Sequence, residues 1–576
     1  MIKYTKKHLS VSKALITPRN CGTILSFVRK NRQLETIEIQ NAYTTGRSFA
    51  PASLRILWKE LTKHKTLTSI SLHNTNCVPT IEDANEDDSV CHDGKDGANL
   101  VEFCITFCEV HLSCVKWIWV NYAHDTRLEK LVLSDNSMCD EEIEIICKIF
   151  QTNRSITHLD ISSNQFGVDA TANICNSILN NSANNVLRTL VIESNNLQNA
   201  GAFLLCDALR ANTRLCALNV AHNKIGGQGI LRLADLLLGN TVLNVLSIAK
   251  NYSNTIAQAH LHRALQCNTR LLSLDVSGLV DEDPSLNESG SDFVIQTSAV
   301  DTVTLIAACK NIQYLRLDNI HTSVSLMQRI QVQLSMNTVL RRISFASCGL
   351  TLETAYVFAR GMSMNKSITQ IDLSDNQLCE LAGVAHHDRV LDTRFWDMLA
   401  EKENLEILAL RGNALGTRTM WHAADFLTKN KTLKVLDVAD NGIGSIGALV
   451  MLHAISRNKS LQVLDMTQNA SFPESYSRLL SAILRSRICA QEATNLHVRG
   501  IPLFVSAREM RHFLASASHN NMQITKNDLL TTWDKDCHTR KVAFLLLTRR
   551  RLCVGLLPQL YVDCLRLILS YDILFA

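Results

Sequence analysis

The segment Leu187-Arg-Thr-Leu190-Val-Ile192-Glu-Ser-Asn195 contains a pattern of apolar residues closed by an asparagine, and this pattern decides the fold. It recurs as Leu215-x-x-Leu218-x-Val220-x-x-Asn223 and again as Leu243-x-x-Leu246-x-Ile248-x-x-Asn251. Successive copies are 28 residues apart. A constant step of this size is typical of proteins built from stacked repeats.

Each copy predicts one strand followed by one helix. The apolar residues alternate with period two, as in a short strand with one buried face. The asparagine amide can serve backbone groups in the bend that follows. Residues Ile230, Leu233, Ala234 and Leu237 then have the spacing of a buried helix face. An asparagine such as Asn240 predicts a left-handed cap at the end of that helix.

The pattern extends well beyond these three copies. Its first apolar residue falls at Leu128, Ile156, Leu187, Leu215, Leu243, Leu271, Ile312, Leu340, Ile368, Leu405, Leu433 and Leu461. Longer steps indicate inserts within 180–185, near 280–292 and near 379–393. The asparagine is replaced by Leu279, Ile320 and Cys348, so the middle of the array is irregular.

The pattern weakens toward the N-terminus. Strands are predicted after Leu34 and Leu67, whereas the segment from Leu100 fits either a strand or a helix. An acidic loop is expected at 79–98. We therefore expect atypical repeats or a cap in residues 1–127, regular repeats in 128–487, and a C-terminal cap or helical segment in 488–576, since terminal repeats must face water on one side.

Composition narrows the class of protein. The segment from residue 538 onward accounts for the net charge of +4, so the rest of the chain is close to neutral. The repeats therefore carry no basic stripe that would attract nucleic acid. We expect no membrane span, because no apolar run of about 18 residues occurs. The N-terminal residues lack the apolar stretch of a secretory signal, which favours the cytoplasm and leaves the nucleus open. Cys147, Cys175 and Cys206 share one repeat position with alanines, so we expect buried, reduced thiols there.

The repeats resemble the ribonuclease-inhibitor-like type of leucine-rich repeat. The resemblance is carried by segments such as Ala208-Leu-Arg-Ala-Asn-Thr-Arg-Leu-Cys-Ala-Leu-Asn-Val-Ala-His-Asn223 and covers residues 128–487. It implies an α/β solenoid shaped as a horseshoe, with a parallel concave sheet and outer helices. Members of this family are protein-binding surfaces in inhibitors, in regulators of small GTPases and in sensors of immune receptors.

In this architecture the side chains between the leucines point out of the concave sheet. The candidate partner-binding residues are therefore His158, Asp160, Glu193, Asn219, Asp275, Tyr314, Arg316, Asp318, Arg342, Asp372, Arg411, Asp437 and Asp465. One interpretation is an acidic docking strip interrupted by arginines. The other is that Leu-Asp-Leu-Ser is ordinary usage where a polar residue must face water.

The remaining motifs do not predict catalysis. The sequence has no phosphate-binding loop, no Gly-x-Ser-x-Gly elbow and no His-Glu-x-x-His pair. His386-His387-Asp388 reads as a solvated insert, and Trp117 with Trp119 as part of a capping helix. We expect no catalytic residue, no bound metal and no cofactor.

The C-terminal segment allows two interpretations. Residues 557–571 have apolar side chains at helical spacing, which suits a cap over the last repeat. They are also loosely similar to the Leu-Pro-plus-helix core of F-box and SOCS-box modules, which recruit cullin-type ubiquitin ligases. The sequence thus predicts a non-enzymatic scaffold that binds another protein on its concave face. The alternatives are a substrate receptor that binds ubiquitin-ligase components and, less strongly, a regulator of small GTPases.

Overall fold

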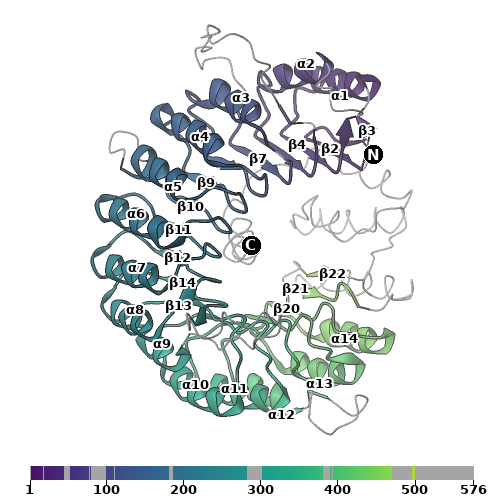
Figure 1. The fold of residues 1–576 in the computed structure, drawn as a ribbon. Coiled ribbons are helices and arrows are strands. Elements are labelled where there is room, and N and C mark those ends of the chain that lie inside the picture. The colour runs from purple at the N-terminus through teal and green to yellow at the C-terminus, as the bar shows by residue number, and fades with distance from the viewer. Residues whose placement is uncertain are drawn as a thin grey trace, which may run out of the picture.

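The fold is a curved solenoid in which the strands line the inner, concave side and the helices form the outer layer (Figure 1), as seen in a computed structural model. The structure describes residues 2–13, 15–16, 18–44, 52–76, 78–79, 99–108, 110–180, 186–281, 301–379, 390–391, 393–469, 480 and 496–499. The mixed α/β solenoid predicted from the repeats is confirmed.

One long sheet runs through the whole molecule. In spatial order its strands are β1 (Ile2–Tyr4), β2 (His8–Ser12), β4 (Thr36–Gln40), β6 (Ser69–His73), β7 (Glu102–Thr106), β8 (Lys130–Val132), β9 (His158–Asp160), β10 (Thr189–Val191), β11 (Ala217–Asn219), β12 (Val245–Ser247), β14 (Ser273–Asp275), β16 (Tyr314–Arg316), β17 (Arg342–Ser344), β18 (Gln370–Asp372), β19 (Ile407–Ala409), β20 (Val435–Asp437), β21 (Val463–Asp465) and β22 (His497–Arg499). Pairing is parallel throughout, except that β1 pairs antiparallel with β2. Short pairs β3 (Leu15–Ile16) with β5 (Tyr43–Thr44) and β13 (Tyr252–Ser253) with β15 (Val280–Asp281) lie beside it.

The register of the regular repeats is confirmed. Every strand of the long sheet from β8 to β21 begins two residues after the apolar residue that opens its repeat. The central leucines of neighbouring strands are paired, for example Leu218 with Leu246, and both are about 1% exposed. A continuous apolar core therefore runs behind the sheet, because each repeat buries its leucines against the next.

The N-terminal repeats continue the same sheet with longer strands. β4, β6 and β7 have five residues and alternate between half-buried and buried side chains. The segment from Leu100, which the sequence left open, is therefore a strand. Phe103 and Ile105 on β7 are fully buried, so this repeat contributes to the common core.

The helices cover the outer face. They are α1 (Pro18–Lys30), α2 (Ala52–Leu61), α3 (Leu112–Tyr122), α4 (Asp140–Thr152), α5 (Val168–Ile174), α6 (Gln198–Ala211), α7 (Gly227–Gly239), α8 (Thr255–Cys267), α9 (Thr302–Ala308), α10 (Val324–Met336), α11 (Leu352–Met364), α12 (Thr393–Ala400), α13 (Gly416–Lys429) and α14 (Ser445–Arg457), and α5 continues into the π-helical turn η1 (Cys175–Leu179). Cys147, Cys175 and Cys206 are buried as expected, and burial raises the pKa of each thiol to about 12. These thiols are therefore protonated packing groups.

Where the repeat asparagine is present, it bonds the backbone at the bend after the strand, as the pattern predicts. Asn223 is fully buried; its Nδ2 donates to the carbonyl oxygens of Ile192 (2.8 Å) and Ala221 (2.9 Å), and its Oδ1 accepts from the Asn195 backbone nitrogen (3.2 Å). The preceding residue, His222, has a left-handed φ of 51°. The asparagine thus satisfies backbone groups of two repeats at the point where the chain bends.

The predicted left-handed cap at the end of the helices is wrong. Asn240 and Asn268 are extended, with φ of −79° and −72°. Their role is to connect neighbouring repeats. For example, Asn212 Nδ2 donates to the Leu179 carbonyl oxygen (2.9 Å), while Oδ1 accepts from the backbone nitrogens of Arg214 and Leu215 (both 2.9 Å). An extended backbone is required because the chain must turn back toward the sheet at this residue.

Lys402 occupies this second asparagine position in one repeat. Its Nζ donates to the Asn365 carbonyl oxygen at 2.6 Å, although the lysine is only 1% exposed. Burial lowers the pKa of this amine to about 8. A cation has therefore replaced a neutral amide inside the solenoid.

The tryptophan-rich segment packs on the core between α2 and α3. Trp117 meets Trp58 edge-on, with ring centroids 5.6 Å apart, and contacts Phe103 and Tyr122. Trp119 points outward and is 39% exposed. Trp117 is therefore a partly buried residue that packs against the core, and Trp119 does not belong to the buried helix face.

Several predictions concern segments outside the described residues. They are nearly all of the acidic loop 79–98, most of the inserts near 280–292 and 379–393 including His386-His387-Asp388, and the C-terminal segment 557–571. The proposed division into N-terminal, regular and C-terminal parts stays a prediction.

Candidate protein-binding surface

The predicted partner-binding residues come together on the concave face. We define the central row as the side chain at the last residue of each strand from β9 to β22. Strand pairing places Asp275 beside Arg316, Arg316 beside Ser344, and Ser344 beside Asp372. Adjacent members are separated by one strand spacing of about 4.8 Å. Residues far apart in sequence therefore form one strip.

The other candidates flank this row. The central row contains Asp160, Asn219, Asp275, Arg316, Asp372, Asp437 and Asp465; His158, Tyr314 and Arg342 begin their strands; and Glu193, Asp318 and Arg411 lie two residues beyond theirs. Most are half-buried. Asp318 and Arg342 are only 2% and 4% exposed, so they support the surface more than they form it.

Aspartates of the central row have a structural task. Asp372 Oδ1 accepts from the Ser374 backbone nitrogen (3.0 Å) and from Ser374 Oγ (2.7 Å). Asp160 makes the same two bonds to Ser162, and Asp437 accepts from the Ala439 backbone nitrogen at 2.9 Å. One carboxylate oxygen of each aspartate thus binds the backbone nitrogen two residues beyond the strand end. This explains why Leu-Asp-Leu-Ser is common here.

The second carboxylate oxygen is available for other interactions. Asp275 Oδ2 accepts from Ser247 Oγ at 3.2 Å, and Asp465 Oδ2 pairs with Arg499 at 3.3 Å. Burial raises the pKa of Asp275 and Asp372, and it raises the pKa of Asp437 to about 6, with the neighbouring Asp465 charge adding to the effect. The aspartates are therefore poorly hydrated when charged.

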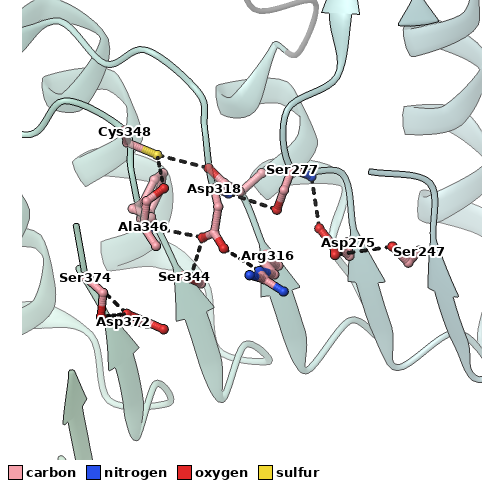
Figure 2. A network of polar contacts seen from close by, with 12 residues as sticks. Ser247, Asp275, Ser277, Arg316, Asp318, Ser344, Ala346, Cys348, Asp372 and Ser374 are labelled. Atoms are coloured by element: carbon pink, nitrogen blue, oxygen red, sulfur yellow. Dashed lines mark hydrogen bonds and ion pairs between the residues drawn. The ribbon is translucent and has the colours of Figure 1, made fainter. Parts of the chain in front are cut away.

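The middle of the row carries a buried charged network where the repeat asparagine is missing (Figure 2). Asp318 pairs with Arg316 Nε, accepts from Ser344 Oγ, and accepts from the Ala346 backbone nitrogen at 2.9 Å. The Asp318 backbone nitrogen donates to Ser277 Oγ at 3.0 Å. The network links three repeats and holds the Arg316 guanidinium on the concave face.

A second charged group near the N-terminal end was not among the predicted residues. Lys130 Nζ lies 2.7 Å from Glu102 Oε1, and both side chains are about 36–37% exposed. His158 is close by, and burial followed by the Lys130 charge lowers its pKa. The sequence signal was present, since Glu102 and Lys130 occupy outward strand positions, but the decayed pattern around Leu100 obscured it.

Strand β7 places a half-buried cysteine, Cys104, on the concave face. Burial, assisted by the Glu102 charge, raises the pKa of the Cys104 thiol to about 12, so this concave-face cysteine is not a nucleophile at neutral pH. Within the same ranges, no group of three His, Cys, Asp or Glu side chains is placed to hold a metal ion. None of the described helices is long and apolar enough to cross a membrane.

Comparison with known proteins identifies the class. The family model described as Leucine Rich repeat matches residues 152–170, 183–206, 211–234 and 429–452. These segments are leucine-rich repeats. The ribonuclease-inhibitor-like subtype remains a prediction.

Individual relatives are more distant. A search of curated proteins found no match. Among solved structures, an internalin from Listeria monocytogenes str. 4b F2365 is similar, with 14% identity, a TM-score of 0.32, and coverage of 68% of this chain and 88% of the internalin chain. Leiomodin-1 Actin-Binding Site 2 is similar over 19% of this chain with 23% identity and a TM-score of 0.18, and the chain spans 62% of that structure's length. Similarity at this level carries no functional argument.

Proposed function

We propose that this chain is a non-enzymatic scaffold that binds a protein partner on its concave face. Leucine-rich repeats form rigid, extended surfaces, and stacked-repeat proteins use such concave surfaces for binding.

The observation that carries the proposal is the charged network in the middle of the array. In β17 the central row holds Ser344 in place of an aspartate, and Asp318 of the preceding repeat accepts from the Ala346 backbone nitrogen instead. A buried ion pair is an expensive way to bind one backbone nitrogen, because both charges must leave water. Departures from a repeat rule of this kind are concentrated at functional sites. The network orients Arg316 on the concave face, and arginine is a common anchor residue in protein interfaces.

Matched valine substitutions test this proposal. Val245 points outward on β12, next to β14, whereas Val332 is 51% exposed on α10 of the outer face. Val245→Arg places a bulky side chain on the concave face without removing a structural hydrogen bond. We expect it to reduce partner recovery in affinity purification with mass spectrometry about tenfold, with Val332→Arg unchanged.

Both variants should melt as the parent chain does, because each adds its side chain on the surface. A partner lost with Val332→Arg and kept with Val245→Arg would move the binding site to the outer face. The ligase-receptor alternative depends on residues 557–571, which lie outside the described part of the chain, so no contact supports it.

A further inference from the structure

The segments that lead from each outer helix back to the concave sheet carry one sign of charge over eight successive repeats. In the repeats opened by Ile156 through Ile368, these segments contain seven basic residues and neither aspartate nor glutamate. We call this row the basic edge; all its members are exposed, and they are Arg154, Arg188, Arg214, Arg270, Lys310, Arg341 and Lys366. The prediction that the repeats carry no basic stripe is wrong for this edge, because a near-neutral total charge hides a local excess.

The charges of the basic edge are largely uncompensated. Among the described residues, five of its cations make no ion pair and no side-chain hydrogen bond, namely Arg188, Arg214, Arg270, Lys310 and Lys366. Acidic residues return at both ends, as Glu129 in the preceding segment and as Glu403 and Glu406 in the following one. The excess is therefore confined to the middle of the array, where it attracts an anionic partner.

Backbone hydrogen bonds hold the basic edge together. The Arg341 backbone nitrogen donates to the Gln313 carbonyl oxygen at 2.8 Å, and the Thr369 nitrogen donates to the Arg341 carbonyl oxygen at 2.7 Å. The Cys216 nitrogen donates to the Arg188 carbonyl oxygen in the same way, at 2.8 Å. Neighbouring repeats are therefore held about 4.8 Å apart at the strands. A partner meets cations that rise from fixed points of the backbone.

Two exposed methionines border the cations. Met336 ends α10 and Met364 ends α11, which are neighbours in the outer layer (Figure 1), and their side chains are 72% and 61% exposed. Lys310 and Lys366 lie two residues beyond a helix end, and Arg341 directly precedes β17. Apolar groups thus lie at the helix side of the edge and cations lie toward the sheet. Flexible methionines are common in surfaces that bind varied protein partners.

This combination distinguishes among anionic partners. Single-stranded nucleic acids are bound through aromatic stacking as well as charge, and the segments of the basic edge contain no Phe, Tyr, Trp or His. A protein segment that alternates acidic and apolar residues suits the edge better. Successive side chains of an extended chain point to opposite sides, so its carboxylates face the cations while its apolar side chains face the methionines. Carboxylates at alternate positions are about 7 Å apart, and the long lysine and arginine side chains can adjust to that spacing.

We propose that the basic edge is a second interaction surface, which binds an extended segment of a protein partner with acidic and apolar residues in alternation. The segment runs across the repeats of β14 to β18. Its carboxylates pair with the cations of the edge, and its apolar side chains contact Met336 and Met364. The proposal goes beyond the concave-face function and does not depend on it, because the edge and the central row present different residues.

The probe is a fluorescein-labelled peptide in which Glu and Leu alternate between Gly-Ser ends, and a matched peptide has Ser in place of Leu. Fluorescence anisotropy with the full chain measures affinity as salt is raised. We expect the Glu-Leu peptide to bind and to weaken with salt, because the paired charges are exposed. Lys310→Gln/Lys366→Gln should lower its affinity about fivefold, since two exposed ion pairs are lost.

Two further variants separate the parts of the edge. Lys224→Gln/Lys250→Gln removes two exposed lysines from the loops that follow β11 and β12, so this matched control should leave peptide binding unchanged. Met336→Ser/Met364→Ser should weaken the Glu-Leu peptide about threefold and leave the Glu-Ser peptide unaffected. All of these side chains are exposed, so each variant should melt as the parent chain does.

The inference fails if the Glu-Leu peptide does not bind the full chain, or if it binds Lys310→Gln/Lys366→Gln equally well. Tighter binding of an oligodeoxythymidine or of phosphatidylserine vesicles would assign the edge to nucleic acid or to a membrane surface. Binding that appears only in Glu86→Gln/Asp87→Asn/Asp88→Asn would assign it to the chain's own acidic segment. If Val245→Arg loses the partner while the peptide does not bind, only the edge is wrong and the concave-face proposal stands.

Discussion

Two neighbouring parts of one sheet end their strands differently. From β10 to β12, Asn195, Asn223 and Asn251 form a ladder in which each amide bonds backbone groups of its own and the preceding repeat. From β14 to β17 the same positions are Leu279, Ile320 and Cys348, which are buried and apolar or nearly so. There the Cys348 thiol bonds the Leu317 and Ala346 carbonyl oxygens, which are the equivalents of the oxygens that Asn223 binds. Asp318 and Ser277 bind the backbone nitrogens two residues beyond the strand ends.

The comparison shows that the bonding requirement is constant while the group that meets it can move. Backbone groups at a buried bend need partners in every repeat. Where the Asn219 amide accepts from the Ala221 backbone nitrogen, no charge is added at that strand end. Where Asp318 accepts from the equivalent nitrogen of Ala346, the face gains an ion pair with Arg316 that a partner can recognise.

The largest test breaks the amide ladder. Asn223→Ala removes three donor bonds and the acceptor for Asn195, so it leaves buried backbone groups of two repeats unpaired. We expect a loss of about 3–5 kcal/mol, since each unpaired group costs about 1–3 kcal/mol. Cys348→Ala removes only weak thiol bonds to Leu317 and Ala346 and should cost about 1 kcal/mol. Hydrogen exchange of the flanking repeats measures both, and equal losses would contradict the ladder.

The next test breaks the charged network. Asp318→Ala leaves Arg316 without its carboxylate and the Ala346 backbone nitrogen without its acceptor. We expect about 2–4 kcal/mol of destabilisation in urea titrations, because a half-buried cation loses its partner. Asp318→Asn keeps an acceptor and should cost less than half as much. If both variants cost the same, the charge is irrelevant to the network.

A third test concerns Lys402, which occupies the position of a helix-ending asparagine. Its folded-state pKa of about 8 lies below the unfolded value of 10.5, so the native state binds fewer protons between these pH values. Stability should therefore rise as pH increases from 8 to 10.5, by about 1–3 kcal/mol through this residue. Lys402→Met should abolish that rise in urea titrations, whereas Lys431→Met, at an exposed site, should retain it. If the parent chain, Lys402→Met and Lys431→Met all show the same pH dependence, the rise in stability does not come from Lys402.

The smallest effect is expected at Asp437, and it is a gain. The folded-state pKa of about 6 exceeds the ordinary value of 3.8, so the native state holds more protons in this window. Stability falls as pH rises through it, and at pH 7 the charged carboxylate destabilises the fold. Asp437→Asn should add about 1–2 kcal/mol at pH 7 and little near pH 4. Calorimetric melting at the two pH values checks this, and a loss at pH 7 would show that the charge stabilises the fold.

Much of the solenoid could be predicted from local sequence. The apolar residue that opens each repeat predicted the register of every strand of the long sheet from β8 to β21. The repeat position that Cys147, Cys175 and Cys206 share with alanines predicted their burial. The concave placement of residues such as Asp160 and Arg316 followed from strand alternation. The Glu102–Lys130 pair was missed, because β7 belongs to a repeat without the asparagine.

The sequence by itself determined the repeat, its register and the side of the sheet on which each residue lies, because a period of two or of 28 residues is written along the chain. Only the tertiary structure decided that Asp318 is buried against Ser344, that Lys402 reaches the Asn365 carbonyl, and that the helix-ending asparagines are extended. Each of these depends on a group one repeat away. Its partner is set by how neighbouring repeats stack around an insert or a missing asparagine, which no single repeat specifies.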